Sequence, residues 1–171
     1  MLKPNLGDLD REKETTWDDI IDFFKGSEAQ VFFEKVKADD IKISYKPQQV
    51  EEIPKQASGT VRELLEKVDE KKKLEEIAKE LAIDKVLDND IKVISGGELQ
   101  RVAIAATVLK KANLYVFDEP TSYLDIKQRI RVSKFIRNLA DDNTAVLVVE
   151  HDLIILDYMT DLVHLMYGKE N

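Results

Sequence analysis

The stretch Ser-Gly-Gly-Glu-Leu-Gln-Arg, residues 95–101, decides how this chain is interpreted. Ser95 is a favourable helix N-cap, and Glu98 three residues later completes a capping box. The glycines Gly96 and Gly97 allow a backbone to come close to a ligand. A helix that begins here directs free N–H groups and the positive end of its dipole outward. The pattern therefore predicts a helix start that suits a phosphate group.

An apolar helix over 102–109 leads from this stretch to Leu-Tyr-Val-Phe-Asp-Glu-Pro, residues 114–120. The apolar run 114–117 is bounded by charge, which predicts a buried parallel strand. Asp118 and Glu119 follow where that strand ends, and open α/β sheets bind ligands at the carboxyl ends of their strands. One acid can hold a magnesium ion while the next orients or deprotonates a water molecule.

Composition limits the classes of function. The chain has 171 residues, enough for one domain with its own core. Its net charge of −8 argues against gripping nucleic acid by bulk electrostatics. It contains no cysteine, which excludes disulfides and cysteine-ligated clusters. No apolar run approaches the roughly 18 residues of a membrane-spanning helix, and residues 1–7 lack a signal-peptide core. We therefore expect a cytoplasmic protein without a membrane partner.

The N-terminal two thirds alternates helices with one strand. Residues 1–11 read as a loop, and capping patterns at Thr16 and Ser27 predict two helices, the first stopping at Gly26. Residues 41–45 alternate apolar and polar side chains, as in a half-buried strand. A further capping box at Thr60 opens a helical region. The predicted division is 1–49 for the first helices and strand, 50–112 for a helical subdomain and 113–171 for the remaining core.

The last third predicts a strand–helix–strand series with right-handed crossovers. An amphipathic helix over 126–139 precedes an apolar strand over 145–149. A helix over 153–159 and a strand over 162–167 complete the series. His151 follows the end of the 145–149 strand, at the sheet edge expected for Asp118 and Glu119, whereas His164 inside the last strand could be core or surface.

Taken in order, these motifs resemble the signature motif, Walker B and D-loop of ABC-type ATPases. The resemblance implies an α/β fold: a partial ABC-type P-loop NTPase domain with a mostly parallel sheet and an inserted helical subdomain. Further segments are similar to the first nucleotide-binding domain of the ABC-E class of ribosome-recycling ATPases, the RNase L inhibitor family of archaea and eukaryotes. These segments are Pro4–Asp8, Trp17–Asp19, Phe24–Gly26, Lys46–Gln48, Ile53–Lys55, Gly59–Leu65, Ser122–Asp125, Val149–Leu153 and Leu156–Tyr158.

The resemblance also implies roles for individual residues. Asp118 would hold Mg²⁺ through water, and Glu119 would polarise the attacking water. His151 and Gln48 would sense the γ-phosphate and the metal, with the adjacent Gln49 as an alternative for Gln48. Residues that would contact ATP held by a second cassette, or lie at the interface between cassettes, are Ser95, Gly96, Gly97, Glu98 and Asp125.

One part of such an ATPase is not present in the sequence. No Gly-x-x-x-x-Gly-Lys-Ser/Thr pattern occurs, and of the glycines only Gly168 precedes a lysine. The expectation is a cassette without its phosphate-binding third, inactive alone. ATP and Mg²⁺ would bind only with the missing N-terminal part of the cassette or with a partner cassette.

The resulting hypothesis is part of a soluble twin-cassette ATPase that couples ATP binding and hydrolysis to ribosome splitting. Its expected partners are the missing N-terminal part, a second nucleotide-binding domain, ribosomal subunits and termination factors. Two alternatives remain open. The chain could be the C-terminal half of another split or transporter-type ABC ATPase, or a non-catalytic interaction fragment.

Overall fold

The computed structural model describes residues 15–166, and the chain forms two compact units, Met1–Ile43 and Ser44–Asn171. The loop expected over 1–11, the Pro4–Asp8 segment and the end of the last expected strand at Tyr167 lie outside the described residues. None of the helices within 15–166 has the length and apolar character that crossing a bilayer requires.

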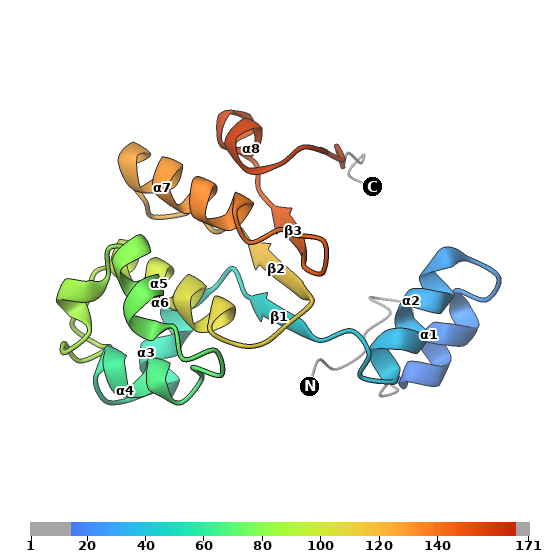
Figure 1. The fold of residues 1–171 in the computed structure, drawn as a ribbon, viewed down its shortest axis with the longest axis horizontal. Helices are drawn as coiled ribbons and strands as arrows, with labels where there is room; N and C mark the ends of the chain where they lie inside the picture. The colour runs from blue at the N-terminus through green and yellow to red at the C-terminus, as the bar shows by residue number, and fades with distance from the viewer. Residues whose placement is uncertain (1–14, 167–171) are drawn as a thin grey trace. The chain divides into compact units, whose positions relative to one another are not determined.

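In the first unit, two helices lie side by side (Figure 1). They are α1 (Trp17–Phe23) and α2 (Glu28–Lys37). The capping box predicted at Thr16 is formed. Ser27 precedes α2 as expected but makes no side-chain cap, because its hydroxyl instead donates to the Phe24 carbonyl at 2.6 Å. The Phe24 and Phe33 rings lie 5.2 Å apart, so aromatic contacts join the two helices.

The three strands of the sheet lie in the order β1 (Ile43–Lys46), β2 (Leu114–Asp118) and β3 (Ala145–Val149) (Figure 1). Strands β2 and β3 pair in parallel, with Leu114 opposite Ala145 and Asp118 opposite Val149. The parallel arrangement inferred from the strand–helix–strand series is confirmed for this pair. Because the register aligns their carboxyl ends, residues that follow β2 and β3 meet at one edge of the sheet.

Helices form most of the second unit. One hydrophobic cluster joins them to the inward side of β2, where Tyr115 and Phe117 are buried. The helix that follows the Ser95 cap contributes Ile104, Val108 and other residues to this cluster. The elements are η2 (Val50–Glu52), α3 (Ile53–Gln56), α4 (Val61–Glu66), α5 (Leu74–Glu80), η3 (Asp84–Val86), α6 (Gly96–Val108), α7 (Ile126–Arg137) and α8 (Leu153–Met159).

The helix starts follow the predicted caps. Both Thr60 at the start of α4 and Ser95 at the start of α6 form complete capping boxes, with Glu63 and Glu98 as their partners. Each box satisfies backbone N–H groups that would otherwise lack partners at the helix start. The sequence therefore located these two helix starts through local chemistry alone.

Strand β1 differs from its prediction. Alternation suggested that the apolar side chains of residues 41–45 face the core, but the structure buries the polar ones, Ser44 and Lys46. Ser44 donates a hydrogen bond to the Thr107 carbonyl at 2.8 Å, and the Lys46 amine donates to the Asp118 carbonyl at 2.7 Å. These buried hydrogen bonds determine which face of β1 packs inward, whereas the Tyr45 side chain on the other face is exposed.

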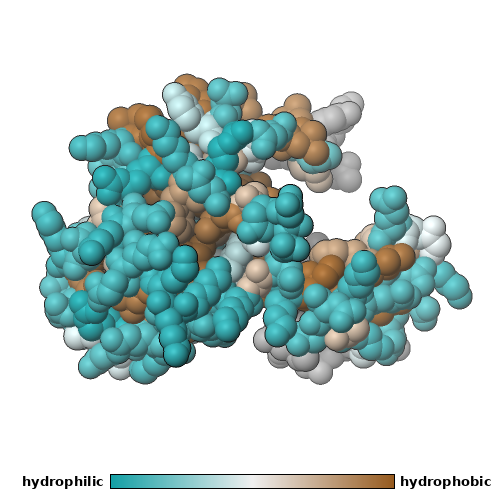
Figure 2. All heavy atoms as spheres, viewed as in Figure 1, coloured by the Kyte–Doolittle hydropathy of each residue, from teal (hydrophilic) through white to brown (hydrophobic). Residues whose placement is uncertain are grey.

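Strand β3 and the chain after it are also more exposed than the sequence suggested. Leu147 and Val149 are 55% and 53% exposed. The strand expected over 162–167 is not formed in its described part, residues 162–166, where His164 is exposed. Figure 2 shows apolar atoms over α8 and the segment that follows it, and the exposed apolar residues there are Leu153, Ile154, Leu162, Val163, Leu165 and Met166. Within 162–166, no pairing with β3 supports a strand, so that prediction was wrong.

The two faces of the sheet should respond differently to truncation. Phe117→Ala, on the buried face of β2, should lower the free energy of unfolding by about 3–5 kcal/mol because it leaves a cavity in the core. Leu147→Ala, on the exposed face of β3, should cost less than about 1 kcal/mol. Urea denaturation followed by circular dichroism measures both, and equal losses would contradict the described burial.

Candidate functional site

The site is built where β1 and β2 end. The Tyr45 hydroxyl on β1 donates a hydrogen bond to Asp118 Oδ2, 3.1 Å away at the end of β2. Partial burial and the hydrogen bond to Asp118 both raise the pKa of Tyr45, so the phenol stays protonated and remains a donor at neutral pH. The contact orients the Asp118 carboxylate from the side of the neighbouring strand.

Glu119 lies directly after β2 in a backbone conformation that few L-residues adopt, with φ of +45°. Its N–H donates to the Val149 carbonyl at 2.8 Å, which ties it to the end of β3. Its carboxylate accepts a hydrogen bond from the Ser122 hydroxyl at 3.1 Å. The sharp turn directs the side chain across the strand ends, and such backbone strain is retained only where surrounding contacts hold it.

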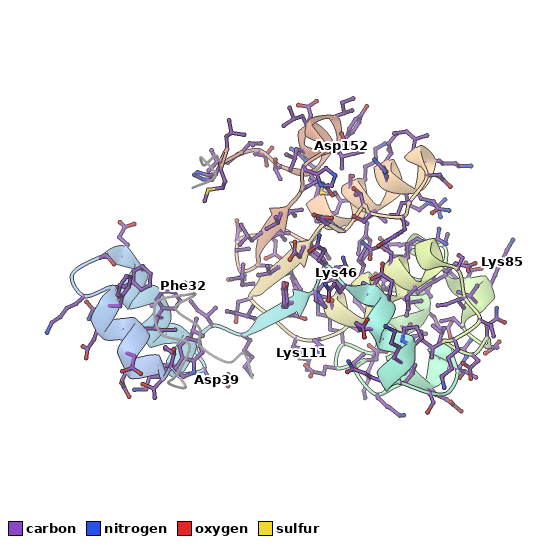
Figure 3. All side chains as sticks on the ribbon, turned by 180° about the vertical axis from the view of Figure 1, so that it is seen from behind. Phe32, Asp39, Lys46, Lys85, Lys111 and Asp152 are labelled. Carbon is purple, nitrogen blue, oxygen red and sulfur yellow. The ribbon has the colours of Figure 1, made fainter. Side chains whose placement is uncertain are left out.

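Two buried donors hold the Glu119 backbone. The Gln100 amide on α6 donates to the Glu119 carbonyl at 2.7 Å, and the Lys46 amine on β1 donates to it at 3.3 Å. Lys46 also donates to the Asp118 carbonyl, and both Lys46 and Gln100 are fully buried. Figure 3 labels Lys46 where β1 leads into the helices. Three elements distant in sequence therefore converge on one short turn.

Burial lowers the pKa of Lys46 to about 8, although Asp118, Glu119, Glu150 and Glu51 all act in the opposite direction. Desolvation dominates because the amine donates to neutral carbonyl oxygens, and no ion pair to Lys46 occurs among the described residues.

His151 lies beside Glu119, as expected from their positions after neighbouring strands. Its Nδ1 is 3.8 Å from Glu119 Oε1 and 3.6 Å from Glu150 Oε1, and its side chain is 76% exposed. The Glu150 side chain is 1% exposed, and its other oxygen accepts a hydrogen bond from Thr121 at 2.7 Å. Glu150 Oε1 accepts a hydrogen bond from the His151 backbone N–H at 3.1 Å, so a fixed carboxylate holds the backbone of a histidine whose ring remains accessible to a ligand.

The start of α6 presents the predicted cap. The Ser95 hydroxyl and backbone N–H both donate to Glu98 at 2.7 Å, and these hydrogen bonds lower the pKa of Glu98. Ser95 and Gly96 are exposed, so this helix start is open to solvent within the described chain. Gly97 is in closer contact, because an added Cβ would lie 3.1 Å from the Tyr123 carbonyl oxygen. Its lack of a side chain lets the loop after β2 pack against α6.

Tyr123 and Asp125, in the loop 122–125 after β2, make different contacts. Tyr123 has φ of +64°, and its hydroxyl forms a hydrogen bond with Glu51, which raises the pKa of the phenol. Asp125 is the N-cap of α7 and accepts a hydrogen bond from the Gln128 N–H at 2.9 Å. The loop 122–125 therefore contacts both the start of α6 and the segment that follows β1.

Gln48 and Gln49 are both exposed, two and three residues beyond Lys46. No side-chain hydrogen bond distinguishes them within residues 15–166, so the choice between them stays a prediction. Across these residues, no three His, Cys, Asp or Glu side chains gather into a metal site. Mg²⁺ needs only one or two protein oxygens when phosphates and water complete its shell. The Asp118 carboxylate and an exposed glutamine after β1 have the oxygen atoms that such a site uses, and their role as magnesium ligands stays a prediction.

Sequence reasoning missed Lys46, Gln100 and Glu150. All three lie inside or beside the sequence motifs, but those motifs gave them no role. No sequence signal marked Lys46, because the alternation over 41–45 places the polar residues on the outer face.

Comparison with known proteins shows the family of this chain. The family described as "ABC transporter" matches residues 10–122. The chain belongs to the ABC transporter family. Within ABC proteins, the chain is 49% identical over 167 residues to an uncharacterized ABC transporter ATP-binding protein of Methanocaldococcus jannaschii, covering 98% of this chain and 27% of that protein.

Two solved structures match the fold of this ABC protein equally well. One is titled RNase-L Inhibitor, and the other is a complex of the archaeal ribosomal stalk protein aP1 with the archaeal ribosome recycling factor aABCE1. Each has a TM-score of 0.86 and 52% identity, covering 91% of this chain and 30% of the matched chain. The chain thus spans less than a third of the length of these three similar proteins. The predicted resemblance to ribosome-recycling ABC ATPases, and the α/β fold, are confirmed.

The low pKa of Lys46 predicts a pH-dependent stability. Between about pH 8 and pH 10.5, the folded chain has lost the Lys46 proton and the unfolded chain still carries it. The free energy of unfolding should therefore rise across this window, by about 3 kcal/mol relative to Lys46→Met. Urea denaturation at several pH values measures the difference. The surface variant Lys85→Met should keep the rise, and parallel curves for the wild type and Lys46→Met would contradict the assignment.

The backbone of Glu119 predicts an unusual order of stabilities. Glu119→Gly should be more stable than Glu119→Ala by about 1 kcal/mol, because a Cβ is penalised at positive φ. At Glu76, inside helix α5, the order should reverse by about the same amount. Thermal and urea denaturation of the four variants provide the comparison, and an Ala preference at both positions would refute the left-handed turn.

Proposed function

We propose that this chain supplies the water-activating and signature sides of a twin-cassette ATPase that acts on ribosomes, with the phosphate-binding loop on another stretch of polypeptide. The observation that carries the proposal is the meeting of Glu119 and His151, 3.8 Å apart, beside Asp118 at the carboxyl ends of β2 and β3. A carboxylate, an imidazole and a second carboxylate at this edge match the requirements for hydrolysis of a phosphoanhydride.

In this proposal, each group has a defined task. Glu119 polarises the attacking water, and its strained backbone fixes the direction of the carboxylate. His151, with an exposed ring, donates to the terminal phosphate, while Glu150 holds the His151 backbone N–H. Asp118, steadied by Tyr45, holds Mg²⁺ through water, and Gln48 completes the protein contacts to metal and γ-phosphate. Bound Mg²⁺ would supply charge neutralisation at the phosphates.

The start of α6 acts on a different nucleotide. The exposed cap at Ser95 and Gly96, with Gly97 and Glu98, offers helix N–H groups to the phosphates of ATP held by a second cassette. Asp125 then lies at the interface between the two cassettes. Because these donors reach the phosphates only when the cassettes close, ATP binding favours the closed state and hydrolysis releases it.

The proposed action on ribosomes rests on the proteins that this chain is similar to. A ribosome recycling factor and an RNase-L Inhibitor share 52% identity with this chain. Ribosomal subunits and termination factors in the cytoplasm are therefore the proposed partners, together with the phosphate-loop segment and a second nucleotide-binding domain. ATP and Mg²⁺ are the proposed cofactors, bound only in that assembly.

A non-catalytic interaction fragment is the second candidate, because the sequence contains no phosphate loop. Nucleotide binding separates the two. Titrated with a fluorescent ATP analogue and Mg²⁺, the lone chain should bind weakly or not at all. Addition of a separate polypeptide carrying the phosphate loop should restore binding. Micromolar affinity of the lone chain would refute the assignment of the anchoring groups to another stretch.

Hydrolysis by the reassembled cassette tests the catalytic assignment. Glu119→Gln should leave nucleotide binding intact and lower the turnover of ATP by about 10²-fold or more, since the general base is lost. Glu66→Gln at the end of helix α4 is the matched control and should not change turnover. Phosphate release measures both rates. Subunit separation, followed by light scattering with ribosomes, should be lost in parallel with turnover, and normal splitting by Glu119→Gln would exclude the proposed coupling.

A further inference from the structure

A pocket of about 200 Å³ lies between α6 and α7, in the second unit of the chain. Three of the side chains that line it are cationic, although the chain as a whole carries a net charge of −8. Its walls are formed by Ala82, Arg101, Asp125, Lys127, Gln128 and Arg131. The proposed hydrolysis site assigns no role to these residues, except for Asp125, which it places at the interface between cassettes.

Arg101 is the unusual member of the pocket. It lies on α6, six residues beyond the Ser95 cap, and only 7% of it is exposed. Its Nε is buried and has no hydrogen-bond partner among residues 15–166. A guanidinium cannot lose its proton in a protein, so this donor stays charged and unsatisfied. An unpaired buried donor carries the full cost of its desolvation, so Arg101 brings an uncompensated positive charge to the wall of the pocket.

The positive charges that line the pocket are not neutralised by nearby carboxylates. Lys127 and Arg131 on α7 form no ion pair with any described residue. Burial lowers the pKa of Arg101 and Arg131 lowers it further, against the attraction of Glu98 and Asp125. Both carboxylates are already engaged, because Glu98 accepts from Ser95 and Asp125 accepts from the Gln128 N–H.

We propose that this pocket binds a compact polyphosphate anion. The donors are the three cations that line it, Arg101 on α6 and Lys127 and Arg131 on α7. Guanidinium groups match phosphate oxygens in geometry and form strong charge-assisted hydrogen bonds with them. The adjoining pocket along α7, of about 370 Å³, is not lined by the buried Arg101, so we confine the site to the smaller pocket.

The experiment uses the 171-residue chain and sodium pyrophosphate at low ionic strength, followed by ¹⁵N NMR. Pyrophosphate should bind saturably with one site per chain and shift the Arg101 Nε–Hε signal together with the amides at the start of α7. Arg131→Gln, at an exposed position, should weaken binding about tenfold, a loss expected for one charge-assisted contact. Lys134→Gln removes the same charge from α7 outside the pocket and should change affinity less than about twofold.

A parallel titration with ADP identifies the source of the phosphates. Equal affinities assign the site to a diphosphate whether or not it carries a nucleoside, whereas binding of pyrophosphate alone assigns it to a free polyphosphate. Linear shifts that sodium chloride reproduces at the same ionic strength would overturn the proposal. Shifts centred on Ser95 to Gly97 would also overturn it. Because this site needs neither a phosphate loop nor ATP turnover, its failure would leave the proposed function unaffected.

Discussion

The backbone carbonyl of Glu119 is the point on which the rest of the site depends. It accepts hydrogen bonds from Lys46 on β1 and from Gln100 on α6, both fully buried. In a low-dielectric interior such hydrogen bonds are strong, and an unpaired partner would be costly. The strained turn at Glu119 therefore cannot relax without breaking them. A movement of β1 or α6 would be transmitted directly to the carboxylate, which gives the proposed closure a physical route to the chemistry.

The same principle explains the two faces of the sheet. Polar side chains of β1 are buried because acceptors lie where they reach: the Thr107 carbonyl for Ser44 and the turn after β2 for Lys46. On the opposite face, Leu147 and Val149 are largely exposed within the described chain. Hydrogen-bond satisfaction therefore determines which side of β1 is packed, whereas apolar burial of Tyr115 and Phe117 determines it for β2.

Local chemistry was the part of the fold that the sequence could predict. Capping boxes at Thr60 and Ser95 and the apolar run of β2 are encoded by neighbouring residues, so they were found. The inward face of β1 and the roles of Lys46 and Gln100 depend on contacts between residues far apart in the chain, which alternation does not report. The strand expected over 162–167 failed for a related reason, since an apolar run forms a strand only when a neighbour pairs with it.

The two glycines at the start of α6 differ in how much space surrounds them. An added methyl group on Gly96 would meet the nearest atoms at 3.9 Å, an ordinary contact. On Gly97 it would press against the Tyr123 carbonyl oxygen at 3.1 Å. In a mutational scan of this protein, an alanine at Gly96 would report on what approaches from outside. An alanine at Gly97 would first disturb the packing of α6 against the loop at Tyr123. A loss of activity there could therefore come from altered folding or from a lost contact to a ligand or partner.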